Sequence, residues 1–102
     1  MANDMQEYKG QGMTTEEIVK NVEEICRKED VCHLDLFGSY SKGTQTKYSD
    51  VDFVVYGVKN ISKLREKIDD IPTLKKIDIF DYDSIQNIYL REDMDRYGKR
   101  IY

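Results

Sequence analysis

One stretch in the middle of the chain constrains the fold more than any other. An apolar run ends in a glycine-serine pair, Gly38-Ser39, and ten residues later a second apolar run opens with two carboxylates, Asp50 and Asp52. Apolar runs of this length bounded by turn residues are typical of buried strands. The chain is therefore expected to contain a strand that ends in a tight Gly-Ser turn and a second strand that begins with an acidic pair.

Length and composition limit the classes of protein to which the chain can belong. With 102 residues, of which 39% are hydrophobic and 35% are charged, it is expected to form one globular domain. Its net charge of −4 argues against non-specific nucleic-acid binding, which needs a basic surface. No apolar run approaches the ~20 residues that span a bilayer, so we expect no membrane association. Cys26 and Cys32 fit no metal or redox spacing and are expected to be reduced and packed, as in a cytoplasmic protein.

Helical and strand patterns alternate along the chain. Thr14 and Glu17 have the spacing of a capping box and are expected to start the first helix. Three further helices are expected over residues 39–43, over 61–71, and from a cap at Asp83 or Ser84 to Gly98. Strands are expected over residues 31–37, 51–56 and 76–80, with a short final strand over 99–102. The pattern predicts a flexible leader over residues 1–13 and one domain over 14–102.

These elements predict an α/β architecture, α+β in strict terms, with a small mixed sheet of three to four strands and helices packed on it. Within the second strand, side chains two residues apart point to the same face, so Asp50 and Asp52 should project together. Two adjacent like charges are unfavourable unless a positive charge lies between them. A hard divalent cation such as Mg²⁺, which prefers oxygen ligands and is often completed by substrate phosphates, suits this pair.

The third strand contains another carboxylate. Asp78 interrupts the apolar run between Ile77 and Ile79, where an isolated charge is unfavourable as structure alone. Beside Asp50 and Asp52 it would complete a cluster of three carboxylates able to hold two metal ions roughly 4 Å apart. A solvated strand face would also tolerate Asp78, which is the structural alternative.

The Gly-Ser turn has the properties of a phosphate site. Gly38 allows the backbone to approach a phosphate closely, and a helix that starts after it would point free N–H groups outward. The Ser39 hydroxyl can donate to a phosphate oxygen, although it could equally serve as a helix cap. Lys42 can neutralise phosphate charge, and its alternative is a solvated surface lysine. Phosphoryl-type transfer needs mainly positioning and charge neutralisation, which these residues would provide.

The stretch from Gly38 to Val55 resembles the nucleotidyltransferases of the DNA polymerase β superfamily, whose motif is Gly-Ser, ten residues, Asp-x-Asp. The resemblance covers roughly residues 15–102 and is strongest to the minimal nucleotidyltransferases, whose fuller pattern is Gly-Ser-x-Ala-Arg-Gly and then Ser-Asp-x-Asp-Leu. The matching positions are Gly38, Ser39, Lys42, Gly43, Ser49, Asp50, Asp52 and Phe53. The departures are Ser41 for Ala, Lys42 for Arg and Phe53 for Leu, and Asp78 falls where the family has its third carboxylate.

The resemblance implies an activity and a partner. Asp50, Asp52 and Asp78 would be catalytic metal ligands for two Mg²⁺ ions, with Asp78 helping to deprotonate the acceptor. Gly38, Ser39 and Lys42 would bind the triphosphate of ATP or another nucleoside triphosphate, whose nucleoside monophosphate is transferred to a hydroxyl as pyrophosphate leaves. Minimal nucleotidyltransferases are frequently the antitoxins of all-helical HEPN-type toxins and can adenylylate a tyrosine of the toxin. The acceptor is therefore expected on such a partner or on a second copy of the chain.

Two other functions remain open at this point. The chain could be an antitoxin-like module that binds a nucleotide or a partner without turnover. It could also transfer a nucleotide to a small molecule or to RNA, which the acidic charge makes less favourable. Outside the motif, His33 is expected to be structural or exposed, and Asp35 lies on the same side of its strand and could approach the site.

Overall fold

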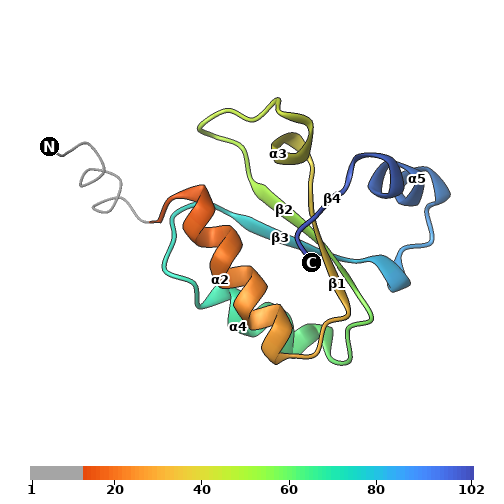
Figure 1. Ribbon diagram of the computed structural model, residues 1–102, viewed down its shortest axis with the longest axis horizontal. Coiled ribbons are helices and arrows are strands. Elements are labelled where there is room, and N and C mark those ends of the chain that lie inside the picture. The colour runs from red at the N-terminus through yellow and green to blue at the C-terminus, as the bar shows by residue number, and fades with distance from the viewer. Residues whose placement is uncertain (1–12) are drawn as a thin grey trace, which may run out of the picture.

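The computed structural model describes residues 13–102, so the expected leader lies, apart from Met13, outside the described residues. Four strands form one sheet in the order β3-β2-β1-β4. The strands are β1 (His33–Phe37), β2 (Val51–Tyr56), β3 (Ile77–Asp81) and β4 (Lys99–Arg100). β1 pairs antiparallel with both β2 and β4, whereas β2 and β3 are parallel. The small mixed sheet expected from the sequence is confirmed (Figure 1).

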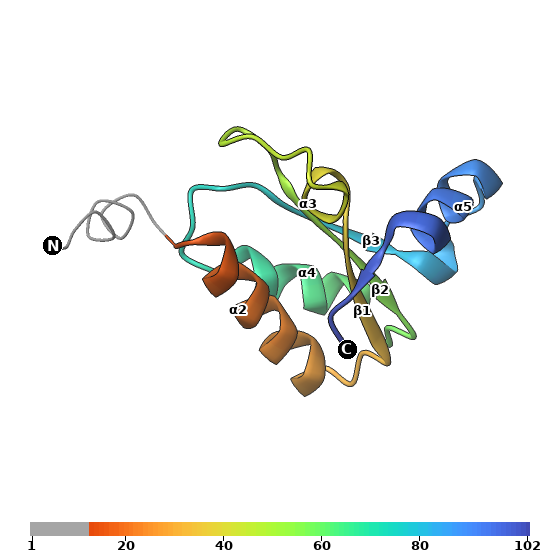
Figure 2. The same ribbon diagram turned by 45° about the horizontal axis from the view of Figure 1, so that its top comes forward.

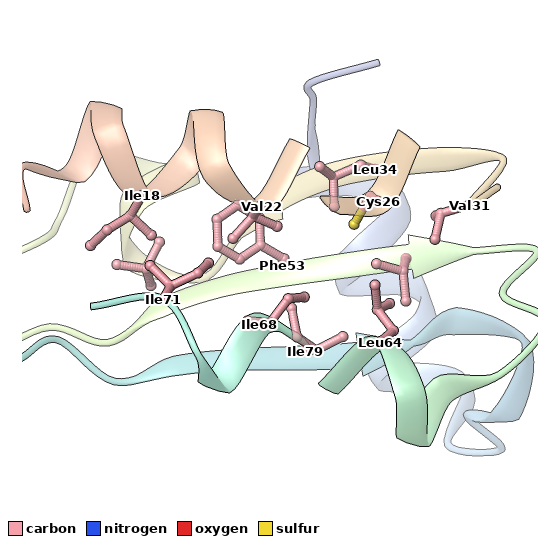
Figure 3. Close-up of a cluster of buried hydrophobic side chains, with 12 residues drawn as sticks. Ile18, Val22, Cys26, Val31, Leu34, Phe53, Leu64, Ile68, Ile71 and Ile79 are labelled. Carbon is pink, nitrogen blue, oxygen red and sulfur yellow. The ribbon is translucent and has the colours of Figure 1, made fainter. Parts of the chain in front are cut away.

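Two long helices cover one face of the sheet. α2 (Thr15–Lys28) and α4 (Ile61–Asp69) lie next to each other on this face in both views (Figures 1 and 2). Both helices have buried apolar stripes, Ile18, Val22 and Cys26 on α2 and Leu64 and Ile68 on α4. Phe53 of β2 is completely buried between them (Figure 3). This layer forms the main hydrophobic core of the domain.

One helix packs against part of the opposite face of the sheet. α5 (Ile88–Tyr97) contributes Met94, which is 1% exposed, to a second apolar cluster with Phe37 and Val54. The alternation of side chains along β2 therefore separates two cores, with Phe53 on the α2 and α4 side and Val54 on the α5 side. Asp52 has the same parity as Val54, so it belongs to the α5 side of the sheet.

Local sequence signals determine the starts of most helices. The expected capping box is present at α2, where Glu17 N–H donates to Thr14 Oγ1 over 3.1 Å and Thr14 N–H donates to Glu17 Oε1 over 2.9 Å. The short helix α3 (Ser39–Lys42) begins at Ser39 and stops before Gly43, as expected, and Gly38 and Gly43 are its two cap residues. β2 has the expected bounds, and β1 and β3 differ from the expected ranges by one or two residues.

The start of the last helix was wrongly predicted. The expected caps, Asp83 and Ser84, lie in a short 3-10 helix (Tyr82–Ser84) that is capped by Asp81. α5 begins only after Asn87, whose side chain accepts hydrogen bonds from the N–H groups of Tyr89 and Leu90. The expectation for the thiols holds for Cys26, which is buried, and is wrong for Cys32, which is exposed. Within residues 13–102, no helix combines the length and the apolar character required to cross a membrane.

The junction between α5 and β4 leaves no room for a side chain. A Cβ atom on Gly98 would lie 2.6 Å from the carbonyl oxygen of Met94 and 2.8 Å from Oδ2 of Asp35. We expect Gly98→Ala to lower the free energy of unfolding by about 1–3 kcal/mol, because α5 or β4 must shift to relieve the overlap. Urea unfolding followed by circular dichroism measures this loss, and wild-type stability in the variant would contradict the packing described here.

Candidate active site

The pairing of β2 with β3 brings two carboxylates together at one end of the sheet. Because these strands are parallel and in register, Asp52 lies directly opposite Asp78, as Val51 does opposite Ile77. Side chains at paired positions share a face of the sheet, so both carboxylates project toward the α5 side. The expected meeting of these two residues is therefore confirmed by the strand register.

Charge and burial change the acidity of Asp52. Its pKa is raised from an ordinary value of 3.8 to about 6. Partial burial is the largest cause, and the negative charges of Asp78 and Asp50 add to it, whereas Lys76 opposes the shift. The three acidic side chains thus form one electrostatic group, and the ionised form of Asp52 is less favourable than that of an ordinary aspartate.

Gly38 lies directly beside the side chain of Asp52. β1 ends at Phe37, which pairs with Asp52, and Gly38 follows with φ of 70°. A Cβ atom at Gly38 would lie 2.3 Å from Oδ2 of Asp52. Both the positive φ and the close approach of the carboxylate therefore require glycine at this position. Gly38 of the Gly-Ser turn therefore lies directly against the carboxylate of Asp52.

α3 carries the other two residues predicted to bind phosphate. Ser39 is its first residue, and the first N–H groups of a helix have no partner within the helix. Lys42 is the last residue of α3, and its ammonium lies 4.6 Å from the ring centre of Tyr97 at the end of α5. The cation therefore stands between α3 and α5, on the side of the sheet toward which Asp52 projects.

Asp50 is held differently from the other two carboxylates. It precedes the first residue of β2 and is exposed, so it is not a member of the strand ladder. Within residues 13–102, no three acidic, histidine or cysteine side chains are already close enough to hold a metal ion. The donor set nevertheless suits Mg²⁺, because carboxylate oxygens are its preferred ligands and the charges that raise the pKa of Asp52 favour a cation at this point.

Two residues beside this group have contacts that the sequence did not predict. The ammonium of Lys76 lies 3.8 Å from Oδ1 of Asp78, an ion pair whose partners are 69% and 33% exposed. Asp35, considered only as a neighbour of the site, is 6% exposed. Its carboxylate contacts Nε2 of His33 at 2.6 Å and accepts a hydrogen bond from the Tyr56 hydroxyl at 3.1 Å. These contacts use both oxygens of Asp35, which makes it a structural residue of the α5 side.

The contacts of Lys76 and of Asp35 differ in how far the sequence could have predicted them. Lys76 lies two residues before Asp78, directly before the first residue of β3, so a charged pair on one face could have been expected from the alternation. The partners of Asp35 include Tyr56, which is 21 residues away along the chain. That contact depends on the antiparallel pairing of β1 with β2.

Comparisons with known proteins agree with this geometry. A family model described as "Polymerase beta, Nucleotidyltransferase" matches residues 20–102. Among solved structures, a chain in the crystal structure of a toxin-antitoxin with AMP-PNP is 26% identical, with a TM-score of 0.61 over 87% of this chain and 73% of that chain. No curated protein matches the chain significantly.

Two mutants of the toxin-antitoxin MntA-HpeT are also similar. One is 26% identical with a TM-score of 0.62, covering 88% of this chain and 72% of that chain. The other is 23% identical with a TM-score of 0.57 over 88% and 73% of the two chains, which supports the fold alone. The family match covers the Gly-Ser turn, the three carboxylates and all four strands. The chain therefore belongs to the polymerase beta nucleotidyltransferase family.

Proposed function

We propose that the chain transfers a nucleoside monophosphate, AMP from Mg-ATP, to a hydroxyl group on a partner protein. The observation that carries this proposal is the register that places Asp52 beside Asp78, with Gly38 in contact with Asp52. The similarity to a toxin-antitoxin with AMP-PNP supports an adenine nucleotide as the donor. It also supports a toxin as the acceptor, for which a helical HEPN-type protein is our candidate.

Each group at the site has a proposed role. Asp50, Asp52 and Asp78 would hold Mg²⁺, which when bound neutralises charge on the triphosphate and on the departing pyrophosphate. Ser39 would donate its hydroxyl and backbone N–H to phosphate oxygens at the start of α3, where Gly38 lets the backbone approach. Lys42, located between α3 and α5, would add a positive charge to the phosphate side of the site.

Every bond and every proton of the proposed reaction is accounted for by ATP, the acceptor hydroxyl and Asp78. The acceptor oxygen attacks the α-phosphorus of ATP and forms a new oxygen–phosphorus bond. The bond from the α-phosphorus to the bridging oxygen breaks, and that oxygen leaves as part of pyrophosphate. The proton of the acceptor hydroxyl passes to the carboxylate of Asp78, which lies on the same face as Asp52. No covalent intermediate with the chain is required.

Removal of one carboxylate tests the proposed catalytic role. We expect Asp52→Asn to reduce AMP transfer by at least about a hundredfold, because the amide cannot supply the negative charge that a metal ion needs. The measurement is incubation of the chain with Mg²⁺ and ATP labelled at the α-phosphate in an extract of the organism that encodes it. Asp93→Asn, which changes an exposed acid on α5, is the matched control and should keep wild-type transfer.

The labelled product distinguishes the acceptor classes. Label on one protein, present with the wild type and with Asp93→Asn but absent with Asp52→Asn, would support a protein acceptor and identify it by mass. Label on RNA or on a small molecule would reject a protein acceptor while leaving nucleotidyl transfer in place. If no molecule is labelled, the transfer proposal fails and a partner-binding module without turnover becomes the better description.

Protonation of Asp52 predicts a stability difference that depends on pH. The pKa of Asp52 is raised to about 6 in the folded chain, so the folded state binds the proton more tightly than the unfolded state. This contribution to the stability of the metal-free fold is fully present below about pH 4 and is lost as the pH rises through 6. We expect the metal-free Asp52→Asn variant to melt at the same temperature as wild type below about pH 4 and at a higher temperature above about pH 7. Thermal melts followed by circular dichroism measure this difference, and an equal gap at both pH values would refute it.

The same protonation predicts how a bound metal ion affects stability. Mg²⁺ with AMP-PNP should raise the melting temperature of the wild-type chain at about pH 7.5 and have little effect at about pH 5, because a protonated carboxyl does not bind the cation. Asp52→Asn should show no such increase at either pH. A metal-dependent increase in the variant would show that the cation is bound elsewhere.

A further inference from the structure

The turn that precedes Asp50, residues 46–49, lies outside the strand ladder of the sheet. Its hydrogen bonds are mostly internal: Ser49 N–H donates to the carbonyl oxygen of Thr46 over 3.1 Å, and Thr46 N–H donates to Ser49 Oγ over 2.9 Å. These bonds shape the turn but do not attach it to the rest of the domain. Asp50 lies between Ser49 of this turn and Val51 of β2, so on one side the position of its carboxylate depends on what holds the turn.

Lys75 provides that attachment. Its ammonium donates to the carbonyl oxygen of Lys47 over 3.1 Å and approaches the carbonyl oxygen of Ser49 at 3.5 Å. The next residue, Lys76, accepts a hydrogen bond from the N–H of Val51 over 2.9 Å. The residues on both sides of Asp50 are therefore bound to two consecutive residues at the entrance to β3.

Lys75 also contacts the helix that carries Ser39. Its ammonium lies 5.8 Å from the ring centre of Tyr40 in α3, and the Tyr40 hydroxyl accepts a hydrogen bond from Thr15 over 3.4 Å. The backbone of Lys75 is itself fixed, because its N–H donates to Thr73 Oγ1 over 3.1 Å. One half-buried side chain thus connects α3, the turn before Asp50 and the start of β3.

From these contacts we propose that Lys75 is a positioning residue for Asp50. Its charged hydrogen bonds hold the turn that leads into Asp50, so that the Asp50 carboxylate can join Asp52 and Asp78, whose places are set by the strand register, when a metal ion binds. This inference rests on the proposed function in that the three carboxylates bind a metal–nucleotide complex. The lysine does not contact the reacting atoms and acts through the backbone at Lys47 and Ser49.

Loss of the ammonium is compatible with a folded chain. A cavity of about 740 Å³ opens beside Lys75 and Lys47, so water can reach the carbonyl groups that the lysine leaves. Water satisfies a carbonyl but does not tie it to α3 and β3. Lys75→Met keeps the aliphatic stem and removes the three donors, so it should loosen the turn without opening the core.

The experiment compares Lys75→Met with Lys75→Arg and with Lys63→Met in the full chain. Lys63 of α4 is the control, because its substitution removes the same charge at a lysine whose ammonium lies 3.8 Å from Glu29 and makes no contact with the turn. Calorimetric titration with Mn²⁺ and AMP-PNP should show binding about tenfold weaker for Lys75→Met, the effect of losing one charged hydrogen bond. Lys75→Arg should recover most of this loss, because its guanidinium can donate to the same carbonyls, and Lys63→Met should bind like wild type.

Hydrogen exchange separates this inference from the proposed function. Amides of residues 44–51 should exchange faster in Lys75→Met than in wild type or in Lys63→Met, whether or not nucleotide binds. If wild type binds no Mn²⁺ and AMP-PNP, the proposed function fails while faster exchange still supports the role of Lys75 in holding the turn. Unchanged exchange, or full binding by Lys75→Met when wild type binds, overturns the inference.

Discussion

The parallel pairing of β2 with β3 is the constraint on which the site depends. It places Asp52 opposite Asp78 on a half-buried face, where two negative charges raise each other's energy. A parallel pair needs a crossover, and α4 supplies it while burying Leu64 and Ile68 against the sheet. The apolar layer formed by α2 and α4 therefore holds together an acidic arrangement that would be unfavourable on its own.

Gly38 brings the start of α3 to this strand pair. Its missing side chain lets the end of β1 contact Asp52, and its φ of 70° directs the chain into α3. The start of α3 consequently lies beside the carboxylates. The free N–H groups at the start of the helix favour an anion, and the carboxylates beside them favour a cation. A metal-bound triphosphate needs these two environments next to each other.

The sequence predicted those features that depend on local or periodic patterns. The capping box at Thr14, the bounds of β2 and the separation of Asp52 from Phe53 onto opposite faces all follow from spacing along one element. The start of α5 was missed because Asn87, Asp83 and Ser84 are all good caps and only tertiary packing selects among them. Lys75 was missed because its partners lie 26 and 28 residues away in sequence.

The ammonium of Lys76 compensates only part of the negative charge of the acidic group. Lys76 lies 3.8 Å from Asp78, but its side chain is 69% exposed, and ion pairs of this kind contribute at most about 1 kcal/mol. The pKa of Asp52 stays raised despite this lysine, so the negative charges are only partly compensated. The exposed pair limits the repulsion between the carboxylates without burying a positive charge among them.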